Sequence, residues 1–188
     1  FINSRDNKIL KFNFKKLIIN NSVKGSRYDV VVPVSGGKDS IYQILQLLKI
    51  TKKILAVNVD FGLRTELGEK NLNLITDKLN VDLIKFSIKK DTVKKLALYS
   101  LNHYGDPDLF NHPLIYNIPP IIANSFNIKT VVYGEDPRIE YSNTKIENLH
   151  TLINQKFDKS FFNKFVSHSK INLTLILNKL NIPKDERD

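Results

Sequence analysis

A strand, a glycine turn and a helix follow one another without interruption in the first quarter of the chain. The run from Tyr28 to Val34 is mostly valine, which is typical of a parallel strand buried on both faces. Residues 41–49 carry apolar side chains at helical spacing. Between them stands Ser35-Gly-Gly-Lys-Asp-Ser40, whose glycines can take positive φ, so that backbone N–H groups can converge on an anion at the start of the helix. The segment predicts a phosphate-binding loop; the alternative is a turn that binds nothing.

The side chains of this loop have the chemistry that a phosphate site needs. Ser35 and Ser40 supply hydroxyl donors, Lys38 supplies a cation, and Asp39 offers an oxygen ligand for Mg²⁺. The spacing differs from that of the Walker A loop and from the dinucleotide-binding glycine pattern. A phosphate site of another class is therefore indicated.

The chain beyond this loop alternates between the two kinds of element. Three further apolar runs predict strands at 54–59, 81–86 and 129–133, and amphipathic spacing predicts helices at 65–79, 91–103 and 114–126. Residues 8–20 fit a helix or a strand equally well. The segment beyond Asn143 is expected to be helical, because its phenylalanines recur at near-helical spacing.

This alternation predicts an α/β fold: a doubly wound parallel sheet of about four to five strands with helices on both faces. The carboxyl ends of parallel strands share one edge, where ligands bind near the topological switch point. We therefore expect residues 35–40, 58–62 and 134–136 to line one pocket. Taken singly, each could equally be an ordinary polar strand end.

We expect a single α/β domain in the 188 residues. Residues 27–143 would form it, with 1–26 as a lead segment and 144–188 as a C-terminal helical segment. No apolar run approaches the length of a membrane span, and the first residues do not read as a secretory signal. A cytoplasmic location without membrane contact is the expectation.

Composition limits the partners and the chemistry. The sequence contains no cysteine, which excludes a disulfide, a thiolate zinc site and a cysteine nucleophile among these residues. The net charge of +10 is compatible with an anionic partner such as tRNA or a nucleotide sugar. Because the lysines are scattered along the chain, we favour a solvated basic surface, and nucleic acid is the less favoured partner.

The hexapeptide Ser35–Ser40 resembles the pyrophosphate loop of the N-type ATP pyrophosphatases, the PP-loop superfamily. Three later segments, in order, are similar to the N-acetyl sugar amidotransferases of surface-polysaccharide and flagellin-glycan pathways. They are Asp60-Phe-Gly-Leu-Arg-Thr-Glu-Leu-Gly-Glu-Lys-Asn-Leu72, Tyr104-Gly-Asp-Pro with Leu114-Ile-Tyr116 and Pro119, and Tyr133-Gly-Glu-Asp-Pro-Arg-Ile-Glu-Tyr141. The resemblance covers about Arg27 to Tyr141 and implies a HUP/PP-loop ATPase-like fold.

The resemblance also implies an activity. Such enzymes use ATP and Mg²⁺ to adenylate the acetamido oxygen of an N-acetyl sugar, and ammonia then displaces AMP to leave an acetamidino group. The expected acceptor is an N-acetylated nucleotide sugar or a nonulosonic acid. A separate glutaminase subunit is expected to supply the ammonia, since this sequence lacks the cysteine that glutamine hydrolysis usually requires. The oligomeric state is left open, with a homodimer as one option.

Roles carried over to matching positions define the expected site. The expected catalytic residues are Lys38 and Asp39. The pyrophosphate would be held by Ser35, Gly36, Gly37, Lys38 and Ser40, together with Asp39. Magnesium would be bound by Asp39 and Glu135, and the remaining nucleotide contacts would come from Val34, Asn58, Asp60 and Gly134. Expected substrate contacts are Arg138, Glu140, Tyr141 and His112, with His103 as a second candidate proton shuttle.

Duller interpretations of these residues remain open. Asp60 is equally a turn carboxylate, Arg138 and Glu140 equally a surface ion pair, and either histidine a solvated loop residue. The sequence also departs from the family, with Ser142-Asn143 where two glycines are usual and Asp108 and Asn111 where some relatives have cysteines. Two alternatives for the whole chain are a lysidine-synthetase-like tRNA-modifying enzyme and a non-catalytic ATP-binding module.

Overall fold

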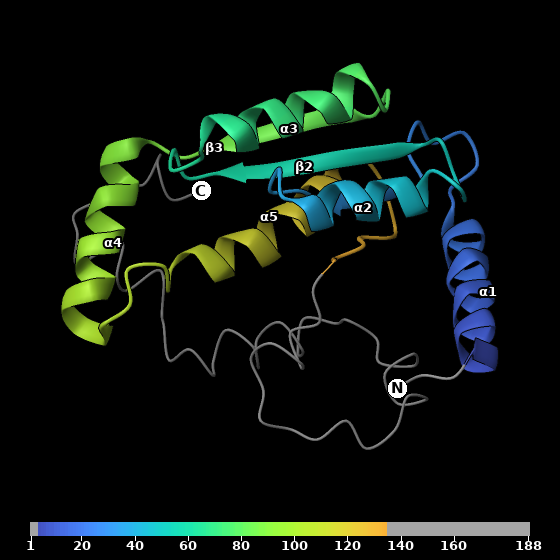
Figure 1. The fold of residues 1–188 in the computed structure, drawn as a ribbon, viewed down its shortest axis with the longest axis horizontal. Helices are drawn as coiled ribbons and strands as arrows, with labels where there is room; N and C mark the ends of the chain where they lie inside the picture. Colours follow the sequence, from blue (N-terminus) through green and yellow to red (C-terminus); the bar gives the residue numbers. More distant parts are fainter. Residues whose placement is uncertain (1–3, 135–188) are drawn as a thin grey trace. The chain divides into compact units, whose positions relative to one another are not determined.

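The computed structural model describes residues 4–134, with side chains from Phe12 onward (Figure 1). The chain divides into two compact units. Unit 1 consists of Phe1–Ser87 and Asn117–Gly134, and unit 2 includes Ile88–Tyr116. The sheet and the predicted phosphate loop both belong to unit 1. The predicted C-terminal helical segment, 144–188, lies outside the described residues.

Three parallel strands form the sheet of unit 1, in the order β1-β2-β3. They are β1 (Val30–Pro33), β2 (Ile54–Asp60) and β3 (Asp82–Ser87). All three lie where the β-branched runs predict strands, and the predicted parallel pairing is confirmed.

The predicted fourth strand is reduced to a single parallel bridge between Val131 and Val31. Val31 N–H donates to the carbonyl of Thr130 at 2.9 Å, and Val132 N–H donates to the carbonyl of Val31 at 2.9 Å. This segment therefore lies on the side of β1 away from β2. The described part of the chain thus has three strands and one bridged segment, where the sequence predicts four to five strands.

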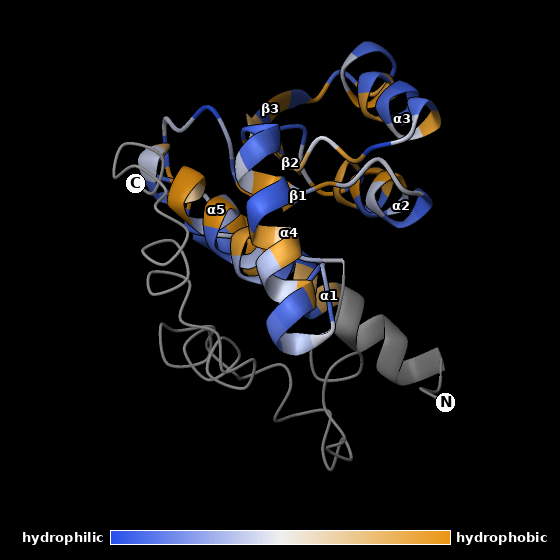
Figure 2. Ribbon diagram, turned by 90° about the vertical axis from the view of Figure 1, so that its left-hand side faces the viewer, coloured by the Kyte–Doolittle hydropathy of each residue, from blue (hydrophilic) through white to orange (hydrophobic). Residues whose placement is uncertain are grey.

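Five helices connect and flank these strands in residues 4–134. They are α1 (Ser4–Asn21), α2 (Lys38–Leu47), α3 (Glu66–Asp77), α4 (Lys90–Tyr104) and α5 (Asn111–Ser125). Helix α1 decides the ambiguous segment 8–20 in favour of a helix. In Figure 2, α2 and α3 each carry both hydrophilic and hydrophobic residues, as helices covering a sheet do.

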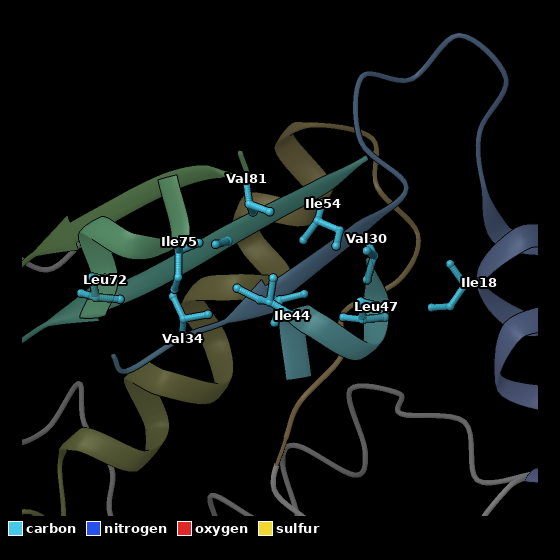
Figure 3. Close-up of a cluster of buried hydrophobic side chains, with 11 residues drawn as sticks. Ile18, Val30, Val34, Ile44, Leu47, Ile54, Leu72, Ile75 and Val81 are labelled. Carbon is cyan, nitrogen blue, oxygen red and sulfur yellow. The ribbon is translucent and has the colours of Figure 1, made fainter. Parts of the chain in front are cut away.

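Two apolar clusters cover the two faces of the sheet. Successive side chains of a strand point to opposite faces, so Val30, Val32 and Val34 enter one cluster and Val31 enters the other. The first cluster adds Ile44 and Leu47 from α2 and Leu72 and Ile75 from α3 (Figure 3). The second adds Leu55 and Val57 of β2 and Ala123 of α5. Helices therefore cover both faces, and the predicted doubly wound arrangement is confirmed.

Unit 2 contains α4 and the start of α5 among its described residues. Gly105 ends α4 in the left-handed conformation (φ +75°), and its N–H donates to the carbonyl of Leu101 at 2.9 Å. Helix α4 therefore ends one residue beyond the helix predicted over 91–103. No helix within residues 4–134 has both the length and the apolar character of a membrane span.

Candidate functional site

The loop from Ser35 to Ser40 joins the end of β1 to the first turn of α2. Val34 continues the ladder after Pro33, because its N–H donates to the carbonyl of Val57 at 2.8 Å. Gly36 then turns the chain with φ +84°, whereas Gly37 is extended and caps α2, which begins at Lys38. Only Gly36 uses the positive φ that the sequence allowed for both glycines. The loop is therefore continuous with the N-terminus of α2, where backbone N–H groups lack intrahelical partners.

Two serine hydroxyls hold the loop closed. Ser40 Oγ accepts the N–H of Ser35 at 3.0 Å and lies 3.1 Å from Ser35 Oγ. Ser35 Oγ in turn accepts the N–H of Gly37 at 3.3 Å. Ser40 is buried beneath the turn. Both hydroxyls predicted as phosphate ligands thus have a structural partner in the loop, and Ser40 in particular sets its curvature.

Lys38 and Asp39 project from the N-terminus of α2. Lys38 Nζ donates to the Asp39 carboxylate at 2.9 Å, and the two side chains are 88% and 83% exposed. An ion pair this exposed contributes little to stability, so the two groups can separate at low cost when a stronger ligand arrives. A phosphate would attract the ammonium, and a divalent cation would attract the carboxylate.

The end of β2 lies against the end of β1. Asn58 is 1% exposed, and its Nδ2 donates to the carbonyl of Val34 at 2.6 Å. Asp60 Oδ1 accepts the N–H of Gly62 at 2.9 Å, the geometry of a turn carboxylate. The structure thus brings Val34 and Asn58 together as the sequence predicts. The contact of Asp60 with Gly62 fits the alternative interpretation of Asp60 as a turn carboxylate.

Arg64 is a site residue to which the sequence assigned no role. Its side chain is 13% exposed. One guanidinium nitrogen donates to Asn58 Oδ1 at 2.5 Å and lies 3.6 Å from Asp60 Oδ1, while the other donates to Glu69 Oε2 at 2.8 Å. The spacing of Asp60 and Arg64, four residues apart and directly after a strand, was the only signal for this contact. Arg64 thus connects the end of β2 to α3.

Glu69 continues this network to the third strand. Its second carboxylate oxygen accepts a hydrogen bond from Lys85 of β3. The hydrogen bonds from Lys85 and then from Arg64 hold the pKa of the Glu69 carboxyl below its ordinary value. The charges at this edge are therefore paired across β2, α3 and β3.

Helix α3 also reaches the glycine turn. Asn71 Nδ2 donates to the carbonyl of Gly36 at 2.8 Å. A Cβ placed on Gly36 would lie 2.4 Å from the carbonyl oxygen of Gly68. The turn is thus packed against the first half of α3 with no room for a side chain. Neither contact has a sequence signal, because the partners are more than thirty residues apart.

The bridged segment 130–133 reaches the same edge of the sheet. Gln43 of α2 donates from Nε2 to the carbonyl of Val132 at 2.6 Å. A Cβ on Gly134 would lie 2.9 Å from Gln43 Oε1, so Gly134 lies against α2. Burial raises the pKa of the Tyr133 phenol, which precedes it. The start of the third expected segment, Gly134, therefore lies against α2, the helix that follows the loop.

The other predicted site residues are not placed in this arrangement. Glu135, Arg138, Glu140 and Tyr141 lie outside the described residues. His112 and His103 belong to unit 2, where His103 Nδ1 lies 2.9 Å from the carbonyl of Tyr99. Among the described residues, no group of three or more carboxylates and histidines could hold a metal ion. Asp39 is thus the one predicted Mg²⁺ ligand whose surroundings are described, and its exposed carboxylate is a donor that suits Mg²⁺.

No family model matches the sequence, and no curated protein matches it. Solved structures do resemble its fold. An NH3-dependent NAD synthetase from Campylobacter jejuni, solved with nitrate, superposes with a TM-score of 0.55 at 14% identity, covering 93% of this chain and 77% of that one.

A glutamine-dependent NAD+ synthetase from Acinetobacter baumannii, solved with ADP, gives a TM-score of 0.53 at 10% identity. This match covers 90% of the present chain but only 34% of that protein, so the chain spans about a third of its length. The chain therefore shares the fold of these synthetases, an α/β fold with a parallel sheet flanked by helices.

Proposed function

We propose that this protein is an ATP-dependent PP-loop enzyme that activates the acetamido group of an N-acetyl sugar as an adenylate and lets ammonia convert it to an acetamidino group. The observation that carries the proposal is the loop Ser35–Ser40. Hydrogen bonds between its two serines hold its shape, and it leads directly into the N-terminus of α2. Gly37, which caps α2, adds no side chain beside the helix N-terminus. That arrangement suits the terminal phosphates of ATP.

The exposed pair at the start of α2 completes the phosphate site. Lys38 would leave Asp39 to neutralise the pyrophosphate, and Asp39 would accept Mg²⁺, with phosphate oxygens and water filling the other positions. Bound there, the ion would neutralise charge on the triphosphate and stabilise the departing pyrophosphate. Holding the β and γ phosphates in the loop leaves the α phosphorus open to a nucleophile.

The chemistry then needs positioning rather than a protein nucleophile. The acetamido oxygen attacks the α phosphorus, the bond to the bridging oxygen breaks, and pyrophosphate leaves. The acetamido nitrogen gives up its proton, so the sugar becomes an O-adenylyl imidate. Ammonia adds to the imidate carbon, AMP departs with the former carbonyl oxygen, and an acetamidine remains. Atoms and charge balance with ATP and ammonia as the only co-reactants.

Two lines of support favour ammonia as the nitrogen donor. The resemblance of its motifs to the amidotransferases implies ammonia, and the fold is shared with synthetases described as NH3-dependent and glutamine-dependent. A separate glutaminase subunit would release the ammonia from glutamine, since no cysteine is present in this sequence to do so. The proposed acceptor is an N-acetylated nucleotide sugar or a nonulosonic acid.

The test is to incubate the protein with ATP, Mg²⁺, ammonium and a panel of N-acetylated nucleotide sugars and nonulosonic acids. Mass spectrometry should detect a sugar in which NH replaces the acetamido oxygen, together with AMP and pyrophosphate in equal amounts. Lys38→Ala should abolish the product, and Lys49→Ala, an exposed lysine just beyond the C-terminal end of α2, should not.

Two outcomes would contradict this proposal. Release of ADP and phosphate in place of AMP and pyrophosphate would remove adenylation from the account. An unchanged sugar panel, combined with tRNA-stimulated release of AMP and a steep dependence of tRNA affinity on salt, would instead favour the tRNA-modifying alternative.

A further inference from the structure

We propose that Asn71 is a positioning residue that locks the peptide between Gly36 and Gly37 in the orientation that binds an anion. This inference rests on the proposed function, because it assigns a task to the loop that is proposed to hold pyrophosphate. It adds a residue of α3, distant in sequence, to the machinery of that loop.

The contact that carries the inference joins a side-chain amide to one particular carbonyl. Asn71 Nδ2 donates to the carbonyl oxygen of Gly36 at 2.8 Å. No peptide bond in the described chain is cis. In a trans peptide the carbonyl and the next N–H point in opposite directions. Asn71 therefore directs the N–H of Gly37 away from α3, toward the interior of the loop, where it meets Ser35 Oγ at 3.3 Å.

The reverse orientation of this peptide is accessible to the chain. Rotating the peptide changes ψ of Gly36 and φ of Gly37, and glycine tolerates both signs of φ. Gly37 has φ −77° in the structure, so the flip would carry it into the positive region, which no Cβ forbids. The flipped peptide would present a carbonyl oxygen to the space where the phosphate is expected. An oxygen there repels an anion and removes a donor.

The surroundings make Asn71 the residue that distinguishes the two states. Gly36 is pressed against the first half of α3, where a Cβ would lie 2.4 Å from the Gly68 carbonyl oxygen. That carbonyl cannot donate a hydrogen bond to the Gly36 oxygen, whereas the amide of Asn71 can. The Asn71 contact is also partly buried, where an intact hydrogen bond is worth more than at the surface. The two glycines allow both orientations of the peptide, and the hydrogen bond from Asn71 selects one of them.

The experiment compares three variants. Asn71→Asp is nearly isosteric but presents an oxygen to the Gly36 carbonyl, so it should favour the flipped peptide. Asn71→Gln keeps the donor on a longer side chain and should recover part of the function. Asn73→Asp, at an exposed position on the same helix, introduces the same charge away from the loop and is the matched control.

Titrations with inorganic pyrophosphate, followed by the amide signal of Gly37 in ¹⁵N-labelled protein, provide the readout. Pyrophosphate affinity should fall by about tenfold or more in Asn71→Asp, which corresponds to the loss of one charge-assisted hydrogen bond. It should fall less in Asn71→Gln and change less than about twofold in Asn73→Asp. Thermal unfolding of each variant shows whether the fold is intact.

The possible outcomes separate the inference from the function on which it rests. If wild-type protein binds neither pyrophosphate nor a nonhydrolysable ATP analogue, the proposed function fails, and this inference fails with it. If wild-type protein binds and Asn71→Asp binds equally well, only the role of Asn71 is wrong. Should Asn71→Asp fail to fold, Asn71→Gln decides: affinity as weak as that of Lys38→Ala, in a folded protein, would overturn the role of the donor.

Discussion

Gly36 and Gly25 share a backbone conformation and differ in their surroundings. Their φ angles are +84° and +82°, both in the region that L side chains rarely adopt. A Cβ on Gly25 would meet nothing within 4 Å, whereas a Cβ on Gly36 would lie 2.4 Å from a backbone oxygen of α3. Replacing Gly25 with alanine therefore adds only backbone strain. Replacing Gly36 with alanine adds the same strain and a steric clash with α3.

Gly25→Ala should lower the free energy of unfolding by about 1–2 kcal/mol, the cost of a left-handed alanine. Gly36→Ala should lower it further, because either the loop or α3 must move. It should also abolish nucleotide binding, which Gly25→Ala should leave intact. Urea unfolding and titration with an ATP analogue measure both effects. The packing described for the loop would be contradicted if the two variants lost the same stability and both still bound the ATP analogue.

Asn58 connects three parts of the site through one side chain. Its amide donates to the Val34 carbonyl and accepts from Arg64, and it is almost fully buried. Asn58→Leu removes both hydrogen bonds, so that the Val34 carbonyl loses this donor and the Arg64 guanidinium keeps only its carboxylate partners Glu69 and Asp60, which should cost about 1–3 kcal/mol. Urea unfolding of the variant provides the measurement. A loss below about 0.5 kcal/mol, within the range of an ordinary surface substitution, would show that neither contact stabilises the fold.

Among the elements, α3 and β3 are tied by the charges around Glu69. Hydrogen bonds from Lys85 and Arg64 lower the pKa of the Glu69 carboxyl from its ordinary value of 4.5. Because the pKa in the folded state lies below that in the unfolded state, this stabilisation is complete above the unfolded pKa and is lost as the pH falls through the folded pKa. The unfolding free energy should therefore decrease as the pH falls below about 5.

Glu69→Gln should make that decrease shallower, and Glu66→Gln, an exposed carboxylate in the same first turn, should retain the wild-type slope. Urea unfolding at a series of pH values measures the slopes. Parallel curves for wild-type protein and Glu69→Gln would mean that the pairing with Lys85 and Arg64 does not persist in solution.

A side-chain hydrogen bond from Gln43 ties helix α2 to the bridged segment 130–133. Gln43 Nε2 donates to the Val132 carbonyl, and Val132 N–H donates in turn to Val31. Gln43→Glu would set a carboxylate against that carbonyl and should loosen the segment. Hydrogen exchange at the Val132 amide should accelerate, while Gln46→Glu, whose side chain faces Lys49, should leave it unchanged. Unaltered exchange in Gln43→Glu would show that the contact does not hold the segment.

Across the whole molecule, the elements that could be predicted are those with a strong local pattern. The valines of β1 identify a strand because burial on both faces leaves a continuous β-branched run. The spacing in α2 and α3 identifies helices because burial on one face leaves a helical period. Segment 8–20 lacked such a period, since its lysines and isoleucines fit a helix and a strand alike. The run 129–133 has strand composition, yet only Val131 is bridged to β1.

The phosphate loop could be predicted in place and in kind, because strand, glycines and helix are contiguous. The contacts that hold it could not. Asn71 with Gly36, Gln43 with Val132 and Arg64 with Glu69 join polar groups whose pairing depends on how elements pack, and many other asparagines and glutamines have the same local sequence character. Sequence spacing alone does not specify which of them meet.

Basic residues also lie at the other end of the strands of unit 1. At the amino ends of the strands, opposite the loop, lies a pocket of about 180 Å³. It is lined by Arg27, Tyr28, Lys52, Lys53, Ile54, Asn80 and Asp82. Three of these residues are basic, but Arg27 is already paired with Asp82, and Lys53 donates to the Ser26 carbonyl. The position of a bound triphosphate therefore distinguishes the loop Ser35–Ser40, which the account predicts, from the basic residues at the opposite edge.

A crystal structure with α,β-methylene ATP and Mg²⁺ distinguishes them and tests the central claim. The β and γ phosphates should lie against Ser35–Ser40 at the N-terminus of α2, with Lys38 turned toward them and the α phosphorus facing open space. An empty loop, or a triphosphate held by Arg27 and Lys52 at the opposite edge, would contradict the account.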